Sequence, residues 1–395
     1  MDRKGHARRD EIELLLLCAQ AKIGSERSDT IRALAGQEID WDSLLNLARQ
    51  NAVTPLLYRG LEAACSEAIP PAVWDRLHQI FRSNAQRNLA MASELIQITE
   101  DLEKAGIPTL SFKGPLLAAA VYGDLSLREF ADLDFLIRKN DLSETSDLLI
   151  SRGYRCKEAE RPGPLKNGSL FGCQHQFVRE EDGILVEMHW FLVPGYFSVQ
   201  FDDEGLWQRA RRWPLGGVEI QSFCPEDLLL FLCVHGCKHL WEKLGWLADI
   251  AKVIHVHDTM DWEWLLNQAR TLRAQRMLFL GLFLAHELLK AELPPEVLQK
   301  VRGEDEVRVL AGEIEARLFK GICGPFKVVE RIFFYWRMRE SFPDRLRNTF
   351  RHILMVMTPT AREWDPLPLP DWLFPLYYLV RPIRLALKYT LGVWE

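Results

Sequence analysis

Two aspartates separated by one apolar residue are the most informative feature of this sequence. Asp132 and Asp134 lead into the apolar run Phe135–Ile137, which is typical of a buried β-strand. Because strand side chains alternate between faces, the two carboxylates point the same way and repel each other. A shared divalent cation, bound through hard carboxylate oxygens, is the simplest way to offset this repulsion.

A third carboxylate and a glycine turn extend the candidate site. Glu187 lies in another expected strand, Ile184–Phe191, and could face the aspartates from an adjacent position. Lys113 and Gly114 close an upstream strand, Ile107–Phe112, at the start of a helix, where backbone amides can hold phosphate oxygens. The pattern indicates metal-dependent nucleotidyl transfer, in which two cations held by three carboxylates stabilise charge on the α-phosphate and the leaving pyrophosphate.

Histidines near the carboxylates are further candidates. His189 falls two residues after Glu187, on the same expected face, and could contact the substrate, support the metal ligands or act as a general base. A histidine packed in the strand beside Trp190 is an equally good interpretation. His175, in the preceding strand, is open to the same alternatives.

A second pair of histidines raises the question of a zinc site. His235 and His239 lie four residues apart on one helix face, but no glutamate follows the first histidine as in the His-Glu-x-x-His arrangement of metalloproteases. Cys233 and Cys237 project about 200° around the helix from His235, so the four side chains cannot converge on one ion. We expect a helix packed on the core, with one histidine near the acceptor pocket and Asp249 belonging to the same packing.

The elements that must position these residues form a small α/β segment between helical regions. Helical spacing fills the first hundred residues and ends in a long stretch, Val73–Ala105, which Gly106 is expected to end as a C-cap. From Pro225 the pattern is helical again up to Arg351, and Met277–Leu289 has the length of a buried helix. The expected regions are a helical N-terminal region (1–104), an α/β core (105–222), a helical C-terminal domain (223–365) and a tail rich in Pro and aromatic residues (366–395).

Short strands with period-two spacing define the α/β core. They are expected at Ile107–Phe112, Leu133–Arg138, Gln174–Arg179 and Ile184–Phe191. The last two flank Glu-Glu-Asp-Gly and are expected to form a hairpin. Asp141 and Glu144 resemble a capping box at the start of the helix after the second strand. The layout predicts an α+β fold.

Composition indicates an ordinary soluble globular protein. The chain has 395 residues, of which 48% are hydrophobic and 26% charged, enough for two or three domains. Its net charge of −6 argues against a protein that coats long nucleic acid by bulk electrostatics. Scattered cysteines, no visible signal peptide and no apolar run long enough to span a membrane predict a cytoplasmic protein with reduced thiols.

The C-terminal part carries clusters of basic residues. Residues 327–351 contain seven Lys or Arg against three acidic residues, which is typical of a charged helix face. The tail contains Tyr377, Tyr378, Arg381, Arg384 and Lys388. This cluster could touch a partner or a membrane surface, but docking of the tail onto the protein is the preferred interpretation.

These features resemble the uncharacterised nucleotidyltransferase family of the polymerase-β-like superfamily. The specific part of the resemblance comprises Lys113-Gly114, Arg128-x-x-x-Asp132-x-Asp134, Gly153-Tyr154 and Glu187-x-His189-Trp190. Outlying matches are Trp41-x-x-Leu44-x-x-Leu47-Ala48, Pro55-Leu56-Leu57-Tyr58, His235-x-x-x-His239-x-Trp241 and Trp246-Leu247-x-Asp249-Ile250. The resemblance covers most of the chain.

The resemblance implies a mixed sheet with helices on one side and a site that carries two Mg²⁺ ions. The site residues are expected to be Asp132, Asp134 and Glu187 as metal ligands, Lys113, Gly114 and Arg128 as phosphate-binding groups, and His189 as an aid to deprotonation of the acceptor. The expected reaction is transfer of a nucleoside monophosphate from ATP or another nucleoside triphosphate to a small molecule, protein or peptide. Pyrophosphate is the second product.

The phosphate turn departs from the superfamily pattern. The superfamily usually has Gly-Ser or Gly-Gly-Ser where this chain has Lys113-Gly114-Pro115, so a hydroxyl is missing and Pro115 offers no amide donor. Lys113 could substitute electrostatically. Two alternatives stay open: AMP transfer to a protein side chain, and a nucleotide-binding or scaffold protein with a weakened phosphate loop, which Pro115 favours.

Overall fold

The computed structural model describes residues 3–22, 24–157, 172–319, 328–365 and 369–391. Its N-terminal region is helical. The helices are α1 (Arg3–Ala19), α2 (Ser25–Ala35), α3 (Trp41–Gln50), α4 (Thr54–Cys65) and α5 (Pro71–Lys104). The long helix α5 is followed by Gly106 with φ +74°, a left-handed conformation that glycine adopts without strain. The expected long helix and its glycine end are therefore confirmed.

A five-stranded mixed sheet forms the centre of the α/β core. Its strands are β1 (Thr109–Ser111), β2 (Asp132–Ile137), β3 (Arg155–Cys156), β4 (Gln174–Val178) and β5 (Leu185–His189), in the order β1-β2-β5-β4-β3. Strands β2 and β5 are parallel, and all other neighbours are antiparallel. The expected hairpin of β4 and β5 is confirmed.

Helices connect the strands and pack against them. Helix α6 (Gly114–Leu117) continues into a π-helical turn, Ala118–Tyr122, and α7 (Leu142–Ser151) follows β2. Helix α5 contacts β1, α6 contacts β2, and α7 contacts β3. The expected capping box at α7 is wrong: Asp141 ends a 3-10 turn with helical φ and ψ, and its side chain makes no capping hydrogen bond.

A second, two-stranded sheet was not expected from the sequence. Strands β6 (Arg211–Leu215) and β7 (Val218–Ser222) form a hairpin, and β7 packs against β1. Gly216 and Gly217 form its turn with φ of +60° and +86°. Two positive φ values match the twist of a two-residue hairpin turn, so this Gly-Gly pair is the sequence signal for the hairpin.

Most of the remaining described residues are helical, which was expected from Pro225 to Arg351 but not for the tail. The helices are α8 (Asp203–Arg209), α9 (Pro225–Lys238), α10 (Leu244–Val256), α11 (Trp262–Thr271), α12 (Gln275–Leu289), α13 (Pro295–Arg302), α14 (Asp305–Phe319), α15 (Val328–Met338), α16 (Phe342–Met357), α17 (Ala361–Trp364) and α18 (Tyr377–Leu391). Helices α9, α10 and α12 pack on one another and are largely buried. Helix α12 confirms the buried helix expected at Met277–Leu289.

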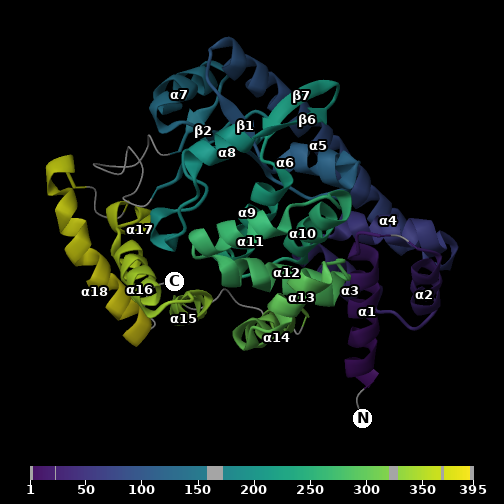
Figure 1. Ribbon diagram of the computed structural model, residues 1–395. Helices are drawn as coiled ribbons and strands as arrows, with labels where there is room; N and C mark the ends of the chain where they lie inside the picture. Colours follow the sequence, from purple (N-terminus) through teal and green to yellow (C-terminus); the bar gives the residue numbers. More distant parts are fainter. Residues whose placement is uncertain (1–2, 23, 158–171, 320–327, 366–368, 392–395) are drawn as a thin grey trace.

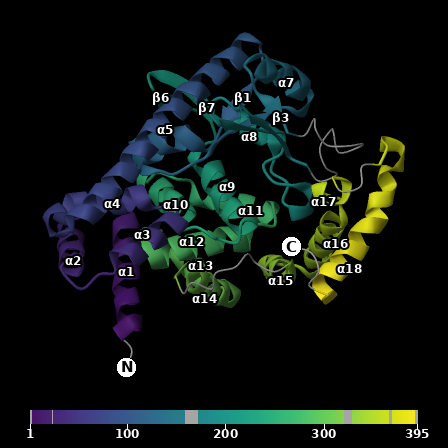
Figure 2. The same ribbon diagram turned by 180° about the vertical axis from the view of Figure 1, so that it is seen from behind.

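The parts of the fold are arranged around these buried helices. Figure 1 shows the sheets with α5 and α7 above, the group α9 to α14 below, and α15 to α18 at one side. Seen from behind in Figure 2, α18 again lies at the edge opposite α1 and α2. Within the described residues, no helix is both long and apolar enough to cross a bilayer. The cysteines of these residues are free and buried.

A close helix contact in the core gives a first testable expectation. A Cβ on Gly236 of α9 would lie 2.3 Å from the Trp241 ring, which is 1% exposed and has no room to shift. We expect Gly236→Ala to lower the free energy of unfolding by about 2 kcal/mol because the core becomes overpacked. Chemical denaturation measures the change.

Gly312 of α14 provides the matched control, since a Cβ there meets nothing within 4 Å. Gly312→Ala is expected to leave stability unchanged or raise it by about 1 kcal/mol, as alanine favours a helix interior. Equal destabilisation by both variants would contradict the packing argument.

Candidate active site

The acidic residues come together through the pairing of β2 with β5. The parallel register places Glu187 beside Asp134 and His189 beside Leu136. Nε2 of His189 lies 3.2 Å from Oδ1 of Asp134 and 3.4 Å from Oε2 of Glu187. Asp132 is on the same face, two residues before Asp134. The strands therefore collect all three expected metal ligands and His189 on one face of the sheet.

The lysine of the phosphate turn points into this cluster. Nζ of Lys113 lies 2.8 Å from Oδ1 of Asp134. Gly114 has φ +55°, and a Cβ there would approach the backbone oxygen of Asp132 to 3.2 Å, so the turn from β1 into α6 favours glycine. Pro115 occupies the first turn of α6.

Repulsion from the neighbouring carboxylates raises the pKa of Asp132. The Asp134 carboxylate, burial and the Glu187 carboxylate together raise the pKa of Asp132 to about 6, although Lys113 acts in the opposite direction. A raised pKa beside two other carboxylates is a mark of crowded negative charge. A divalent cation bound to these carboxylates would relieve the crowding of negative charge.

Asp134 is held ionised by its neighbours. Burial alone would raise its pKa, but Lys113 and His189 hold the pKa of Asp134 well below its usual range. Burial opposes protonation of His189, yet its hydrogen bonds to Asp134 and Glu187 raise its pKa to about 10. Likewise, burial disfavours charge on Lys113, but the aspartates keep its pKa above the ordinary value. At neutral pH, two cations thus lie against the buried Asp134 carboxylate.

Glu187 is oriented by the next strand of the sheet. Gln176 of β4 is its register partner, and Nε2 of Gln176 donates to Oε1 of Glu187 at 2.6 Å. The other carboxylate oxygen, Oε2, faces His189. A glutamate whose two oxygens have separate partners is fixed in one orientation.

Arg128 lies in a buried ion pair with α10. Its Nε and Nη2 donate to the two carboxylate oxygens of Asp249 at 2.8 and 2.9 Å, and the Tyr122 hydroxyl donates to Oδ1 of Asp249 at 2.7 Å. Nη1 of Arg128 is buried and has no hydrogen-bond partner among the described residues. Most of the guanidinium is therefore occupied by Asp249, which was expected from the sequence to belong to the helix packing or to cap it.

The histidines of α9 pack beside Trp246. The ring centroids of His235 and His239 are 4.5 Å apart, and they lie 5.6 and 5.4 Å from the Trp246 ring. Burial holds the pKa of His235 well below its usual range and lowers that of His239 to about 3. Both rings are neutral at physiological pH and form an aromatic wall near the site.

Lys238, in the last turn of α9, feels the charges of the cluster and was not among the residues expected from the sequence. Burial and the nearby Lys113 ammonium lower the pKa of Lys238, while Glu187 and Asp134 act in the opposite direction. Its Nζ forms no ion pair with any described residue. The only sequence signal was its place between His235 and His239 in a family-like segment. A half-buried ammonium without a carboxylate partner is suited to bind an anionic ligand.

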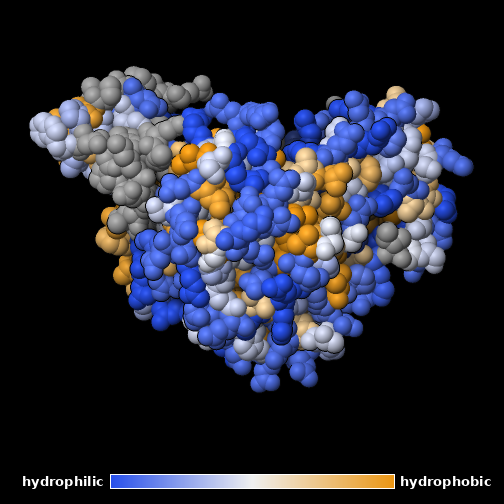
Figure 3. Space-filling view, turned by 90° about the horizontal axis from the view of Figure 1, so that it is seen from above, coloured by the Kyte–Doolittle hydropathy of each residue, from blue (hydrophilic) through white to orange (hydrophobic). Residues whose placement is uncertain are grey.

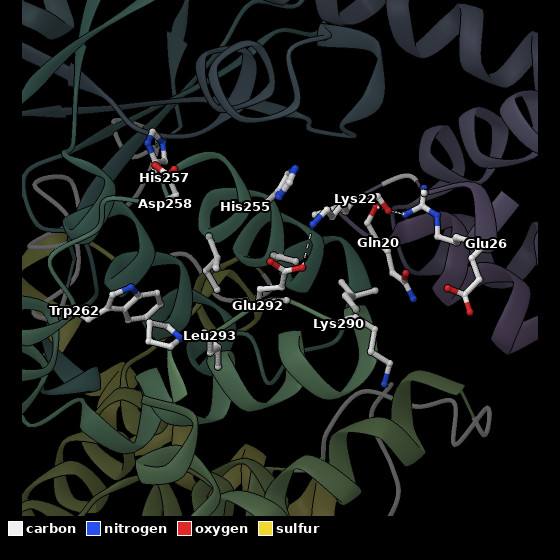
Figure 4. A pocket seen from close by; sticks show the side chains of 18 residues that line it. Gln20, Lys22, Glu26, His255, His257, Asp258, Trp262, Lys290, Glu292 and Leu293 are labelled. Carbon is white, nitrogen blue, oxygen red and sulfur yellow. Dashed lines mark hydrogen bonds and ion pairs between the residues drawn. The ribbon is translucent and has the colours of Figure 1, made fainter. Parts of the chain in front are cut away.

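A larger cavity lies away from these carboxylates. It has a volume of about 580 Å³ and lies where the ends of α1, α10 and α12 meet. Figure 4 shows its polar lining, including Lys22, His255, Asp258 and Glu292, with the Lys22–Glu292 ion pair across it. None of the expected site residues lines this cavity, so it does not contribute to the carboxylate cluster.

The family assignment follows from a sequence match over the region that builds this site. The model of the uncharacterised nucleotidyltransferase family matches residues 37–290, well over half of the chain. The chain belongs to this family of nucleotidyltransferases. No curated protein matches it in sequence.

Two solved structures are distantly similar to this nucleotidyltransferase. One is the antibiotic-resistance factor ANT(2'')-Ia, with 11% identity, a TM-score of 0.35, and coverage of 48% of this chain and 94% of that chain. The other is an antigenic nucleotidyltransferase-like protein from Paracoccidioides brasiliensis, with 17% identity, a TM-score of 0.29, and coverage of 51% and 93%.

Proposed function

We propose that this nucleotidyltransferase moves a nucleoside monophosphate from a nucleoside triphosphate to a small-molecule, protein or peptide acceptor. Mg²⁺ would be the cofactor and pyrophosphate the second product. The observation that carries the proposal is the meeting of Asp134 and Glu187 in register on β2 and β5, with Asp132 on the same face at a raised pKa. Such a cluster is costly unless it serves a cation.

The side chains present fit a divalent cation. Ligand atoms of Asp134, Glu187 and His189 lie within 4.8 Å of one another. Oδ2 of Asp134 is buried and receives no hydrogen bond from the described residues. Asp132, Asp134 and Glu187 would hold the ions through hard oxygens, as Mg²⁺ prefers. Bound ions would stabilise charge on the attacking and leaving oxygens.

The remaining side chains bind the triphosphate or orient the metal ligands. Lys113 and Lys238 supply positive charge for the triphosphate. His189 and Gln176 fix the carboxylates of Asp134 and Glu187. Since Nε2 of His189 lies against both Asp134 and Glu187, we assign it to positioning, and the proton of the acceptor passes to a carboxylate on the same face.

Nucleotide transfer can be tested with labelled substrates. The full chain is incubated with labelled ATP, CTP, GTP or UTP, Mg²⁺ and host extract, with Asp134→Asn as the inactive control. Label on a small product supports transfer to a small acceptor, and label on a protein band supports protein modification. No incorporation, together with a melting temperature that Mg²⁺ and nucleotide leave unchanged, would refute the enzymatic proposal in favour of the scaffold alternative.

Replacing Lys238 is expected to weaken substrate binding without lowering the stability of the protein. Lys238→Met removes a desolvated ammonium, so the protein should be at least as stable as wild type. The KM for the nucleoside triphosphate should rise about tenfold, because a half-buried cation no longer meets its phosphates. Steady-state kinetics and thermal melting measure the two effects.

Lys300, exposed on α13, is the control position. Lys300→Met should change neither quantity. An unchanged KM in Lys238→Met would remove this residue from the proposed phosphate site.

A further inference from the structure

Helix α16 has the reverse of the polarity expected for a helix at a water-exposed surface. Its buried residues are the polar Asp344, Asn348 and His352. Its exposed large residues are Phe342, Leu346, Phe350, Ile353 and Leu354, between 39% and 66% exposed. The spacing of three and four residues places them along one stripe of the helix. This stripe faces outward rather than into the core.

Helix α18 also turns charged residues inward, beside the buried Tyr377. Arg381 and Arg384 turn inward and form ion pairs with Glu363, whose side chain is completely buried. The exposed large aliphatic residues in and just before the helix are Leu376, Leu379, Ile383 and Leu387. Together with the five apolar residues of α16, these four define the outer apolar face. Figure 3, viewed from above, shows small groups of apolar atoms at the left edge beside the residues drawn in grey.

The nine exposed apolar residues of this face indicate a surface that contacts another molecule. Soluble proteins rarely leave large contiguous apolar patches in water, and such patches mark interaction sites. Packing against the rest of the protein does not explain this face, because the buried residues of α16 are polar and α18 turns Arg381 and Arg384 inward beside its buried Tyr377. The occupant must therefore be apolar.

The charge around the outer apolar face indicates which kind of partner covers it. Several of the ten Lys or Arg in residues 328–391, among them Arg337, Arg381 and Arg384, are held in ion pairs and add no free charge to the face. Arg345 and Arg351 donate to backbone carbonyls and a serine hydroxyl, which leave their charge uncompensated, and Arg347 is exposed. A second copy of the chain would bring the same positive charge to the contact, whereas anionic lipid headgroups complement it.

We propose that the outer apolar face seats this enzyme on a membrane surface with anionic headgroups. Helices α16 and α18 would lie in the interface with their apolar side chains among the acyl chains. Trp372, 77% exposed, and Tyr378 stand beside the face, where aromatic rings favour the headgroup level. The contact lies outside the carboxylate site and does not depend on the proposed reaction.

Vesicle flotation of the full chain tests the proposal. Wild-type protein is expected to float with vesicles of phosphatidylcholine and phosphatidylglycerol, less with phosphatidylcholine alone, and less in high salt. The double variant Leu379→Glu, Ile383→Glu should lower the partition coefficient at least about tenfold. The matched control is Leu89→Glu, Ile150→Glu, two residues as exposed but outside the face. Circular dichroism checks folding, and nucleotidyl transfer to a soluble acceptor should persist in both variants.

A measurement without charge insertion supports the result. Brominated lipids should quench part of the tryptophan fluorescence of wild type, and Trp372→Phe should remove that part. Failure of wild type to float with anionic vesicles would overturn the proposal, as would an equal loss in the control variant. A dimer in light scattering that Leu379→Glu, Ile383→Glu converts to monomer, without vesicle binding, would identify a second copy as the occupant instead.

Discussion

Asparagine at position 132 or 134 should abolish nucleotidyl transfer, but the two variants should change the stability of the metal-free protein in opposite directions. Activity is expected to fall at least about a thousandfold in each, because each removes a ligand of the proposed cations. Asp134→Asn leaves Lys113 and His189 buried without their carboxylate, and should lower the free energy of unfolding by about 3 kcal/mol.

Asp132→Asn should instead stabilise the metal-free protein. With a folded pKa of about 6 against an ordinary value of 3.8, native Asp132 keeps a proton that the unfolded chain has released between these pH values. The stability contributed by this residue therefore falls as pH rises through that window, by at most about 3 kcal/mol. Asparagine does not titrate, so the gain should be present at pH 8 and small at pH 4.

Denaturation curves in the presence of a chelator at both pH values measure these effects. Asp147→Asn, an exposed position on α7, is the control and should change neither stability nor activity. Adding Mg²⁺ should raise the melting temperature of wild type but of neither site variant. If Asp132→Asn destabilised the metal-free protein at pH 8, the result would contradict the argument that neighbouring carboxylates repel Asp132.

The second large effect is expected at the buried pair of Arg128 and Asp249. Asp249→Asn should lower the free energy of unfolding by about 3 kcal/mol, because an almost fully buried guanidinium loses its counter-charge. Arg128→Lys keeps the charge but not the two parallel hydrogen bonds, and should be clearly destabilising. Tyr122→Phe removes one hydrogen bond and should cost about 1 kcal/mol.

A double-mutant cycle of Arg128→Ala and Asp249→Ala measures the pair directly, with an expected coupling of at least about 2 kcal/mol. The exposed pair of Arg76 and Asp42, 54% and 84% exposed, is the matched control, with an expected coupling of about 0.5 kcal/mol. If the two cycles gave equal values, burial would not govern this interaction.

These two expectations differ in how far the sequence anticipated them. That Asp132 and Asp134 share one face of a strand, as do Glu187 and His189, follows from period-two spacing, which is a local property of each strand. The partner of Arg128 does not, since Asp249 lies 121 residues away and is brought close only by packing of α10. The role of Arg128 in phosphate binding stays a prediction.

Helices, strands and caps also divide into those that the sequence predicts and those that it does not. Long helices and the β4–β5 hairpin were readable from periodicity and turn residues. The capping box at Asp141 was wrong because a preceding 3-10 turn already places that residue in a helical conformation. Lys238 was missed because a lysine in a helix is ordinarily solvated, and only the tertiary fold partly buries it.

The parallel pairing of β2 with β5 has a consequence for how the protein folds. The two strands are separated in sequence by α7 and the β3–β4 segment, so they can join only after a long loop has closed. Mutual repulsion of the carboxylates then opposes a late step of folding rather than an early one. A bound cation should therefore act mainly on the unfolding rate, prolonging the lifetime of the native state with little change in the rate at which it forms.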